Sequence, residues 1–156
     1  MKLKIKTKLH DGQLPLEVID KGEWVDLRAL KSVSYKKAEL IQVDLGISMK
    51  LPKGFEAVIN PRSSTPKNFG LIQANCQGVI DSSYSGTNDR WAFVGYAFKN
   101  GVVTQAERIC QFRIQPSQKA TAWQKIKWLF TSGIEFEYVD ELDKADRGGF
   151  GTTGKK

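Results

Sequence analysis

Period-two alternation of apolar and polar side chains constrains the fold of this chain more than any other feature. Residues 2–9 alternate lysines with apolar side chains or threonine, and residues 43–51 place an apolar side chain at every second position. Residues 55–59 resume the pattern up to Asn60-Pro61, where proline removes a backbone donor. Because successive side chains of a strand point to opposite faces, each segment is predicted to be a half-buried strand.

Shorter segments extend the same pattern. Strands are also predicted over residues 79–81, 90–98, 108–114 and 133–139. Lys99-Asn100-Gly101 predicts a hairpin turn, since Asn-Gly tolerates the positive φ of a tight turn. Many short strands at this spacing predict an all-β fold, either a sandwich or a small barrel.

One segment, residues 117–132, has helical spacing instead. The apolar residues at this spacing are Ala122, Trp123, Ile126, Leu129 and Phe130. Ser117 is predicted to cap the helix and Gly133 to end it. One interpretation is a short helix that packs two aromatic rings onto the sheet. The other, suggested by the interspersed lysines, is a basic amphipathic surface for a partner.

The composition is that of an ordinary globular chain. Of the 156 residues, 40% are hydrophobic and 26% charged, and the formal net charge is +7. This suits a single domain over residues 1–145, followed by a glycine-rich stretch at 146–156 that we expect to be a mobile tail. The basic charge favours phosphate-bearing partners. Specific nucleic-acid binding is not expected, because the lysines are dispersed along strand faces without a stacking platform.

Several other classes of protein are disfavoured. No apolar stretch approaches the roughly 18 residues of a membrane span, and residues 1–10 lack the apolar core of a secretory signal. Two cysteines, Cys76 and Cys110, cannot build a disulfide framework, so a cytoplasmic location is expected. A single histidine, His10, disfavours a histidine-based zinc site or a Ser-His-Asp triad.

Two segments after predicted strands carry groups suited to a nucleotide. Pro61–Thr65 offers an arginine followed by hydroxyls, which suits phosphate oxygens, although Ser and Thr after proline are also common turn formers. Within Gly78–Gly86, Asp81 emerges at a strand end, where a carboxylate is able to act as a general base toward water. Tyr84 offers an apolar ring face to a sugar or base. The plainer alternative is a hairpin whose Asp and Ser cap their own turn.

Two later segments have the same double meaning. In Arg108–Gln111, Gln111 is either a phosphate or water contact or simply a polar strand residue. Arg147–Gly154 has consecutive glycines, which let backbone amides approach an anion, but it lacks the spacing of a P-loop. Phe150 among these glycines suits a ring that closes over a flat ligand. The alternative is a flexible linker.

Together with Trp24–Ala29, these segments resemble, in order, the five conserved motifs of the trimeric dUTPase family. The third motif is the most specific, with Gly78-Val79-Ile80-Asp81, Tyr84 and Gly86 at the family's positions. The resemblance spans nearly the whole chain. Trp24 and the helical segment are similar to features of phage-type members.

The resemblance implies a β jelly roll assembled as a homotrimer, with active sites built from several subunits. It implies hydrolysis of dUTP to dUMP and pyrophosphate, with Asp81 as the catalytic group that orients and deprotonates the attacking water. Asn75 and the backbone of Val79 would read the uracil edge, and Tyr84 would pack beneath the deoxyribose. The residues implied to contact substrate are Arg62, Ser63, Ser64, Asn75, Gly78, Val79, Ile80, Tyr84, Gln111, Arg147, Phe150, Gly151 and Thr152.

The same resemblance divides the phosphate and base contacts among the motifs. The residues that would hold the triphosphate are Arg62, Ser63, Ser64 and Gln111. Arg147 would contact the terminal phosphate, and Phe150 would lie over the uracil as the tail closes. Mg²⁺ is the implied cofactor, anchored by Asp26 through bound water. This suits an ion that keeps several waters and prefers substrate phosphates.

The chain departs from the family pattern at three places. Ser83 stands where many members carry a second Asp, and Ser85 stands where Arg or Lys is common. Neither residue is the implied base, so turnover is expected to survive. The last motif lacks one or two residues between its Arg-Gly and Gly-Phe, which questions whether Arg147 and Phe150 reach the substrate together.

Two alternatives remain open. The related dCTP deaminases share the fold, but a deaminase-type glutamate is not evident near the implied base site. Phage-type relatives also engage repressor proteins, and a regulatory protein partner of this kind would bind the helical segment at 117–132.

Overall fold

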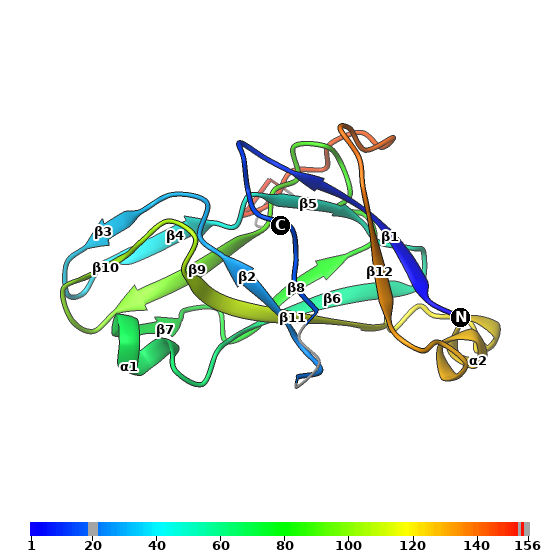
Figure 1. Cartoon of the computed structure of the whole chain (residues 1–156), viewed down its shortest axis with the longest axis horizontal. Helices are drawn as coiled ribbons and strands as arrows, with labels where there is room; N and C mark the ends of the chain where they lie inside the picture. Colours follow the sequence, from blue (N-terminus) through cyan, green and yellow to red (C-terminus); the bar gives the residue numbers. More distant parts are fainter. Residues whose placement is uncertain (19–21, 153, 155–156) are drawn as a thin grey trace.

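The computed structural model describes residues 1–18, 22–152 and 154. Within these residues lie twelve β-strands and two short α-helices (Figure 1), which confirms the all-β prediction. The strands are β1 Leu3–Leu9, β2 Val25–Arg28, β3 Val33–Tyr35, β4 Leu40–Asp44, β5 Ile47–Lys50, β6 Phe55–Pro61, β7 Leu71–Gln73, β8 Gly78–Asp81, β9 Ala92–Ala97, β10 Gly101–Val103, β11 Arg108–Pro116 and β12 Ile134–Tyr138. The helices are α1 Thr65–Phe69 and α2 Ala122–Leu129.

The strands form four small sheets around one hydrophobic core. The sheet orders are β12-β1-β5, β10-β3, β2-β11-β6-β8 and β4-β9-β7. β1 runs parallel to β12, so strands from the two ends of the sequence lie side by side in Figure 1. The largest side chains of the core are Trp91, Phe93 and Phe112, which are fully buried.

The alternating segment 43–51 is buried on one side as predicted, but the prediction of one continuous strand is wrong. Its buried side chains are Val43, Leu45, Ile47, Met49 and Leu51. The chain nevertheless leaves β4 after Asp44 and enters β5 in a different sheet. Gly46 lies at this change of sheet with a φ of +62°, and its N–H donates to the Asp44 carboxylate at 2.7 Å. The alternation therefore predicts that these apolar side chains are buried, but it does not predict where the chain passes from one sheet to another.

The hairpin predicted at Lys99-Asn100-Gly101 is also wrong. β9 and β10 flank this turn but do not pair, because β9 lies between β4 and β7 whereas β10 pairs with β3. The positive φ angles of the described residues do not include Asn100 or Gly101. Asn100 instead accepts the N–H of Lys37 at 2.8 Å. Gly101 allows close packing, since a Cβ there would lie 2.8 Å from the Tyr35 hydroxyl.

The inserted helix is shorter than the predicted range 117–132. α2 begins after Thr121, which forms a reciprocal capping box with Gln124, so Ser117 is not the cap. The helix ends at Leu129, with Phe130 at the C-cap position, before the predicted glycine stop. The capping box satisfies two of the amide donors that a helix start leaves unpaired, which explains why the helix begins at this point.

The prediction that this helix packs its two aromatic rings, Trp123 and Phe130, onto the sheet is wrong, because a different ring packs there. Trp128 lies against Phe55 with ring centroids 5.6 Å apart. Trp123 is 64% exposed, and Leu129 and Phe130 are exposed as well. Neither α1 nor α2, the helices of the described chain, is long and apolar enough to cross a bilayer.

The sheet β2-β11-β6-β8 carries the polar residues singled out by the sequence. Gln111 of β11 lies opposite Asp26 of β2 and Asn60 of β6. Further along, Glu56 of β6 lies opposite Asp81 at the end of β8. The residues that alternate with these face the core, so the polar set shares the outward face of the sheet.

Gly46→Ala is expected to destabilise the fold through two effects. A non-glycine residue at this positive φ costs about 1–2 kcal/mol, and a Cβ at this position would lie 2.8 Å from Leu30 Cδ1. Overpacking of this kind costs about 1–3 kcal/mol more. The measurement is urea unfolding at a fixed protein concentration.

Gly12→Ala is the matched control, because Gly12 has a φ of +80° but nothing lies within 4 Å of its Cβ position. Gly12→Ala should lose only the part of the unfolding free energy that comes from the positive backbone φ. Equal losses in the two variants would contradict the assignment of close packing to Gly46.

Candidate active site

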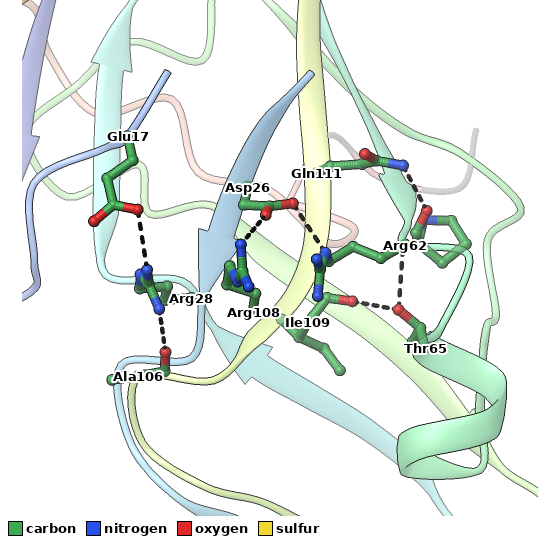
Figure 2. A network of polar contacts seen from close by, with 10 residues as sticks. Glu17, Asp26, Arg28, Arg62, Thr65, Ala106, Arg108, Ile109 and Gln111 are labelled. Atoms are coloured by element: carbon green, nitrogen blue, oxygen red, sulfur yellow. Dashed lines mark hydrogen bonds and ion pairs between the residues drawn. The ribbon is translucent and has the colours of Figure 1, made fainter. Parts of the chain in front are cut away.

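Asp26 holds two arginines together on the outward face of the sheet. Its carboxylate forms an ion pair with Arg62 Nε at 3.0 Å and accepts a hydrogen bond from Arg108 Nη1 at 3.1 Å (Figure 2). The Asp26 side chain is only 11% exposed. Since charge-assisted bonds to a shielded carboxylate fix the planar guanidinium groups, the two cations have defined places before any ligand binds.

The backbone after β6 is fixed by Thr65. Its hydroxyl accepts the N–H of Arg62 at 3.0 Å and donates to the carbonyl of Ile109 at 2.7 Å, as Figure 2 shows. Thr65 is fully buried and begins α1, with Ser64 at the N-cap position and Pro66 in the first turn. The Pro61–Thr65 segment is therefore a structural turn as well as a candidate anion site.

A cavity of about 320 Å³ opens beside these residues. The predicted site residues that line it are Asp26, Arg62, Ser63 and Gln111, together with Trp24. Gln111 donates from Nε2 to the Pro61 carbonyl at 3.1 Å, which orients its amide. Ser64 is not among the residues that line this cavity. Arginine, amide and hydroxyl donors in one cavity are the groups that bind phosphate oxygens.

A second cavity of about 220 Å³ collects the residues of the third and fifth motifs. The predicted site residues that line it are Asn75, Gly78, Val79, Ile80, Tyr84, Arg147, Phe150 and Gly151. Strand β8 and the loop that joins it to β7 supply backbone edges, and Tyr84 and Phe150 supply aromatic rings. Hydrogen-bonding edges flanked by rings are suited to a flat, polar-edged ligand such as a base.

Tyr84 is fixed at both ends. Its hydroxyl donates to the Arg90 carbonyl at 2.9 Å. Its ring lies so close to the tail that a Cβ at Gly149 would be 3.1 Å from Tyr84 Cε2. Burial, with smaller contributions from nearby carboxylates such as Asp89, raises the pKa of Tyr84. The hydroxyl is therefore protonated near neutral pH.

Asp81 lies half-exposed at the end of β8, where both carboxylate oxygens are engaged. One oxygen accepts from the Ser83 N–H at 2.7 Å and from the Ser83 hydroxyl. The other oxygen is 3.3 Å from Arg147 Nη1. Partial burial raises the pKa of Asp81, but the Ser83 hydrogen bonds and the charge of Arg147 outweigh it and hold the pKa below its usual value. Asp81 is therefore ionised at neutral pH and available to accept a proton.

The last motif reaches both Asp81 and the second cavity despite its shortened spacing. Arg147 contacts Asp81, while Phe150 lies in the cavity with Asn75. Thr152 is not among the residues that line this cavity, and its N–H donates to the Gly149 carbonyl at 3.4 Å. The remainder of the motif at position 153, and the predicted tail positions 155–156, lie outside the described residues.

The sequence reasoning missed three residues of this region. Arg90 lines the second cavity and forms ion pairs with Asp44 at 3.0 Å and Asp11 at 3.2 Å. Gly148 turns the tail with a φ of +73°. Asp89 is buried and binds the tail backbone. Arg90 and Asp89 follow the third motif directly, but nothing in a Thr-Asn-Asp-Arg stretch distinguishes a buried carboxylate from an exposed turn.

The chain does not bring all predicted site residues into one cavity. The first cavity holds Asp26, Arg62 and Gln111, the second holds Asn75 and Tyr84, and no residue lines both. Among the described residues, no group of three or more His, Cys, Asp or Glu side chains is placed to hold a metal ion.

Comparisons with known proteins agree with these features. A model of the dUTPase family matches residues 25–154. The chain is 44% identical over 156 residues to the SPbeta prophage-derived deoxyuridine 5'-triphosphate nucleotidohydrolase YosS of Bacillus subtilis (strain 168), and the match covers 100% of both chains.

Two solved phage structures have a similar fold. A mutant dUTPase from phage phi11 of S. aureus, described with a structural Mg(II) ion, has a TM-score of 0.64 and 13% identity, covering 75% of this chain and 93% of that one. The dUTPase of Staphylococcus bacteriophage 80alpha has a TM-score of 0.64 and 16% identity, covering 75% of this chain and 92% of that one. The family match over residues 25–154 and the full-length relative show that the chain belongs to the dUTPase family, whose members hydrolyse dUTP to dUMP and pyrophosphate.

Proposed function

We propose that Asp81 is the general base of dUTP hydrolysis in this chain. The observation that carries the proposal is an ionised, half-exposed carboxylate fixed by Ser83 at the end of β8, beside the base-sized cavity. Asp81 accepts a proton from water, the water oxygen bonds to the α-phosphorus, and the bond to the bridging oxygen of pyrophosphate breaks. Positioning and charge stabilisation account for most of the rate enhancement in such phosphoryl transfers.

The second cavity is the proposed nucleoside site. The backbone of β8 at Val79 and the side chain of Asn75, in the loop before β8, hydrogen-bond the uracil edge. Once a bound base shields these donors and acceptors from water, cytosine is rejected because wrong pairing leaves them unsatisfied. Tyr84, held by its bond to the Arg90 carbonyl, lies where a ribose 2′-hydroxyl would fall, and Phe150 covers the base.

The first cavity is the proposed triphosphate site. Arg62, Ser63 and Gln111 line it and donate to phosphate oxygens, and Ser64 contributes from the N-cap of α1. Arg147 pairs with Asp81 in the nucleotide-free chain. The terminal phosphate offers Arg147 a more highly charged partner, so substrate binding releases the Asp81 oxygen that the attacking water needs.

The donor set fits a magnesium ion that arrives with its nucleotide. An ionised carboxylate has about four acceptor positions, and the two arginines use two of those on Asp26. The remaining positions are able to accept bonds from metal-bound water, as suits an ion that retains most of its hydration. When bound, Mg²⁺ would neutralise phosphate charge, and Asp26 would orient its hydration shell while holding Arg62.

The division of the site between two cavities supports assembly as a homotrimer. One nucleotide has its base and its phosphates joined by a single ribose, so Tyr84 and Arg62 must serve the same molecule. A neighbouring copy that presents its first cavity to the second cavity of this chain completes the site.

Both cysteines are free thiols, which is consistent with the reducing cytoplasm where nucleotides are made.

Asp81→Asn should lower kcat by roughly 10²–10⁴-fold, because an amide keeps the shape but cannot accept the proton. Binding of a non-hydrolysable dUTP analogue should be nearly unchanged. The measurements are pyrophosphate release and calorimetric titration. Asp143→Asn is the control, since Asp143 is an exposed carboxylate paired with Lys50 at 2.6 Å. Near-normal turnover by Asp81→Asn would remove Asp81 from the role of base.

A second proposed function is regulation through a protein partner that binds α2. The helix exposes Trp123, Leu129 and Phe130, and residues 108–134 contain lysines and arginines but no acidic residue. A patch of this kind fits a partner with apolar and acidic side chains. The 80alpha structure is described under the statement that phage dUTPases control transfer of virulence genes, which concerns that protein.

The test is a variant with Trp123, Leu129 and Phe130 each replaced by Ser, which keeps the Trp128 contact with Phe55. We expect turnover within about twofold of the unmodified chain, because the patch lies outside both cavities. The unmodified chain, but not the variant, should retain an acidic host protein whose binding is then reconstituted from purified components. Loss of subunit assembly in the variant would identify the patch as a subunit contact and contradict the proposal.

A further inference from the structure

The carboxylate of Asp89 is buried and bound only by backbone amides among the contacts of the described chain. It is 1% exposed. It accepts from Gly86 N at 2.8 Å, from Arg147 N at 2.9 Å and from Gly148 N at 2.8 Å. A buried carboxylate is costly unless several donors satisfy it, so this arrangement needs the loop amide and both tail amides at once.

Neighbouring residues join the same two segments, residues 86–89 and residues 142–148. Asn88 donates from its backbone and from its side-chain amide to the Asp146 carboxylate, both at 2.8 Å. Thr87 Oγ1 donates to the Leu142 carbonyl at 3.1 Å. Gly86 permits the close approach, because a Cβ there would lie 2.4 Å from Asp146 Cα. The loop 86–89 is therefore a docking loop for the start of the tail.

This docking decides where the last motif begins. With its own N–H and that of Gly148 bound to Asp89, Arg147 directs its side chain to Asp81 at 3.3 Å. Gly148 then turns the chain at a φ of +73°, and Phe150 enters the second cavity. Because the motif is short, Arg147 reaches Asp81 and Phe150 reaches the second cavity only if the first residue of the motif is held in place.

We propose that Asp89 is a positioning residue that fixes the start of the closing tail, so that Arg147 and Phe150 reach the same nucleotide. This inference rests on the proposed roles of those two tail residues. Asp89 acts through two backbone amides and touches neither substrate nor the reacting atoms. The shortened last motif is functional because the docking loop holds its first residue directly beside the site.

The test is Asp89→Asn in the full chain. The amide keeps the shape but turns one of the two acceptor groups into a donor that faces backbone N–H groups. We expect kcat/KM for dUTP to fall about 10- to 100-fold, since hydrogen bonds to a charged group are lost. Trypsin should cleave after Arg147 faster than in the unmodified chain, with cleavage elsewhere unchanged. Asp143→Asn, an exposed carboxylate of the same segment, should change neither quantity.

A double-variant comparison separates positioning from simple destabilisation. In a chain that carries Arg147→Ala and Phe150→Ala, Asp89→Asn should cause little further loss of kcat/KM, because the tail groups that it positions are gone. The same fold-loss in both backgrounds would overturn the inference. If Asp89→Asn hydrolyses dUTP normally while the tail variant is impaired, the inference about Asp89 is wrong but the proposed roles of Arg147 and Phe150 stand. Normal turnover by the tail variant would overturn the proposed tail roles and the inference with them.

Asn88→Ala provides a second test on the exposed side of the same loop. It removes the side-chain bond to Asp146 at 2.8 Å, keeps the bond from the backbone N–H, and does not disturb a buried charge. KM should rise a few-fold, and cleavage after Arg147 should accelerate in the same direction as in Asp89→Asn. An unchanged KM together with unchanged cleavage would count against the docking loop.

Discussion

The pairing of β6 with β11 on one side and β8 on the other is the constraint on which the site depends. It places Gln111 opposite Asn60, and Asp81 opposite Glu56, on the outward face of one sheet. Buried Ile59 and its neighbours fix this register. A slip of one residue would exchange the core face and the outward face of a strand. The hydrophobic core thus determines which polar groups meet the nucleotide.

The positions of the charged side chains follow from this strand pairing. Asp26 sits opposite Gln111 and holds the cations of Arg62 and Arg108, which fixes the positions of the donors proposed to bind phosphate. Asp81 is kept ionised by Ser83 and Arg147. Ser83 stands where an acidic residue is common in the family. It donates hydrogen bonds to Asp81, whereas a carboxylate at this position would repel Asp81. The departure from the family pattern is therefore compatible with turnover.

The sequence predicted groups that lie within one motif better than contacts between motifs. Asn75, Ile80 and Tyr84 were predicted to share a site, and they line one cavity because a short stretch of chain around β8 carries them. The bridge from Asp26 to two arginines could not be predicted, since it depends on cross-strand register. Likewise, alternation identified the buried side chains on both sides of Gly46, but the change of sheet there depends on a backbone φ that alternation does not encode.

Function in this chain requires distant segments to be brought to one nucleotide. Within the chain, the docking loop at residues 86–89 brings the tail to Tyr84 and Asp81. Between chains, the proposed trimer brings the Arg62 cavity of one copy to the Tyr84 cavity of the next. The two forms of assembly can be distinguished by measurement. Only assembly between chains allows two variants that are inactive alone to form an active site when they are mixed.

The most direct measurement mixes Arg62→Ala and Asp81→Asn chains, each inactive alone, by joint refolding in equal amounts. If each site takes Asp81 from one copy and Arg62 from another, random assembly leaves about one quarter of the sites intact, and the mixture should recover about that share of normal pyrophosphate release. A mixture no more active than its separate components would contradict the account, because the complete site would then lie within a single chain.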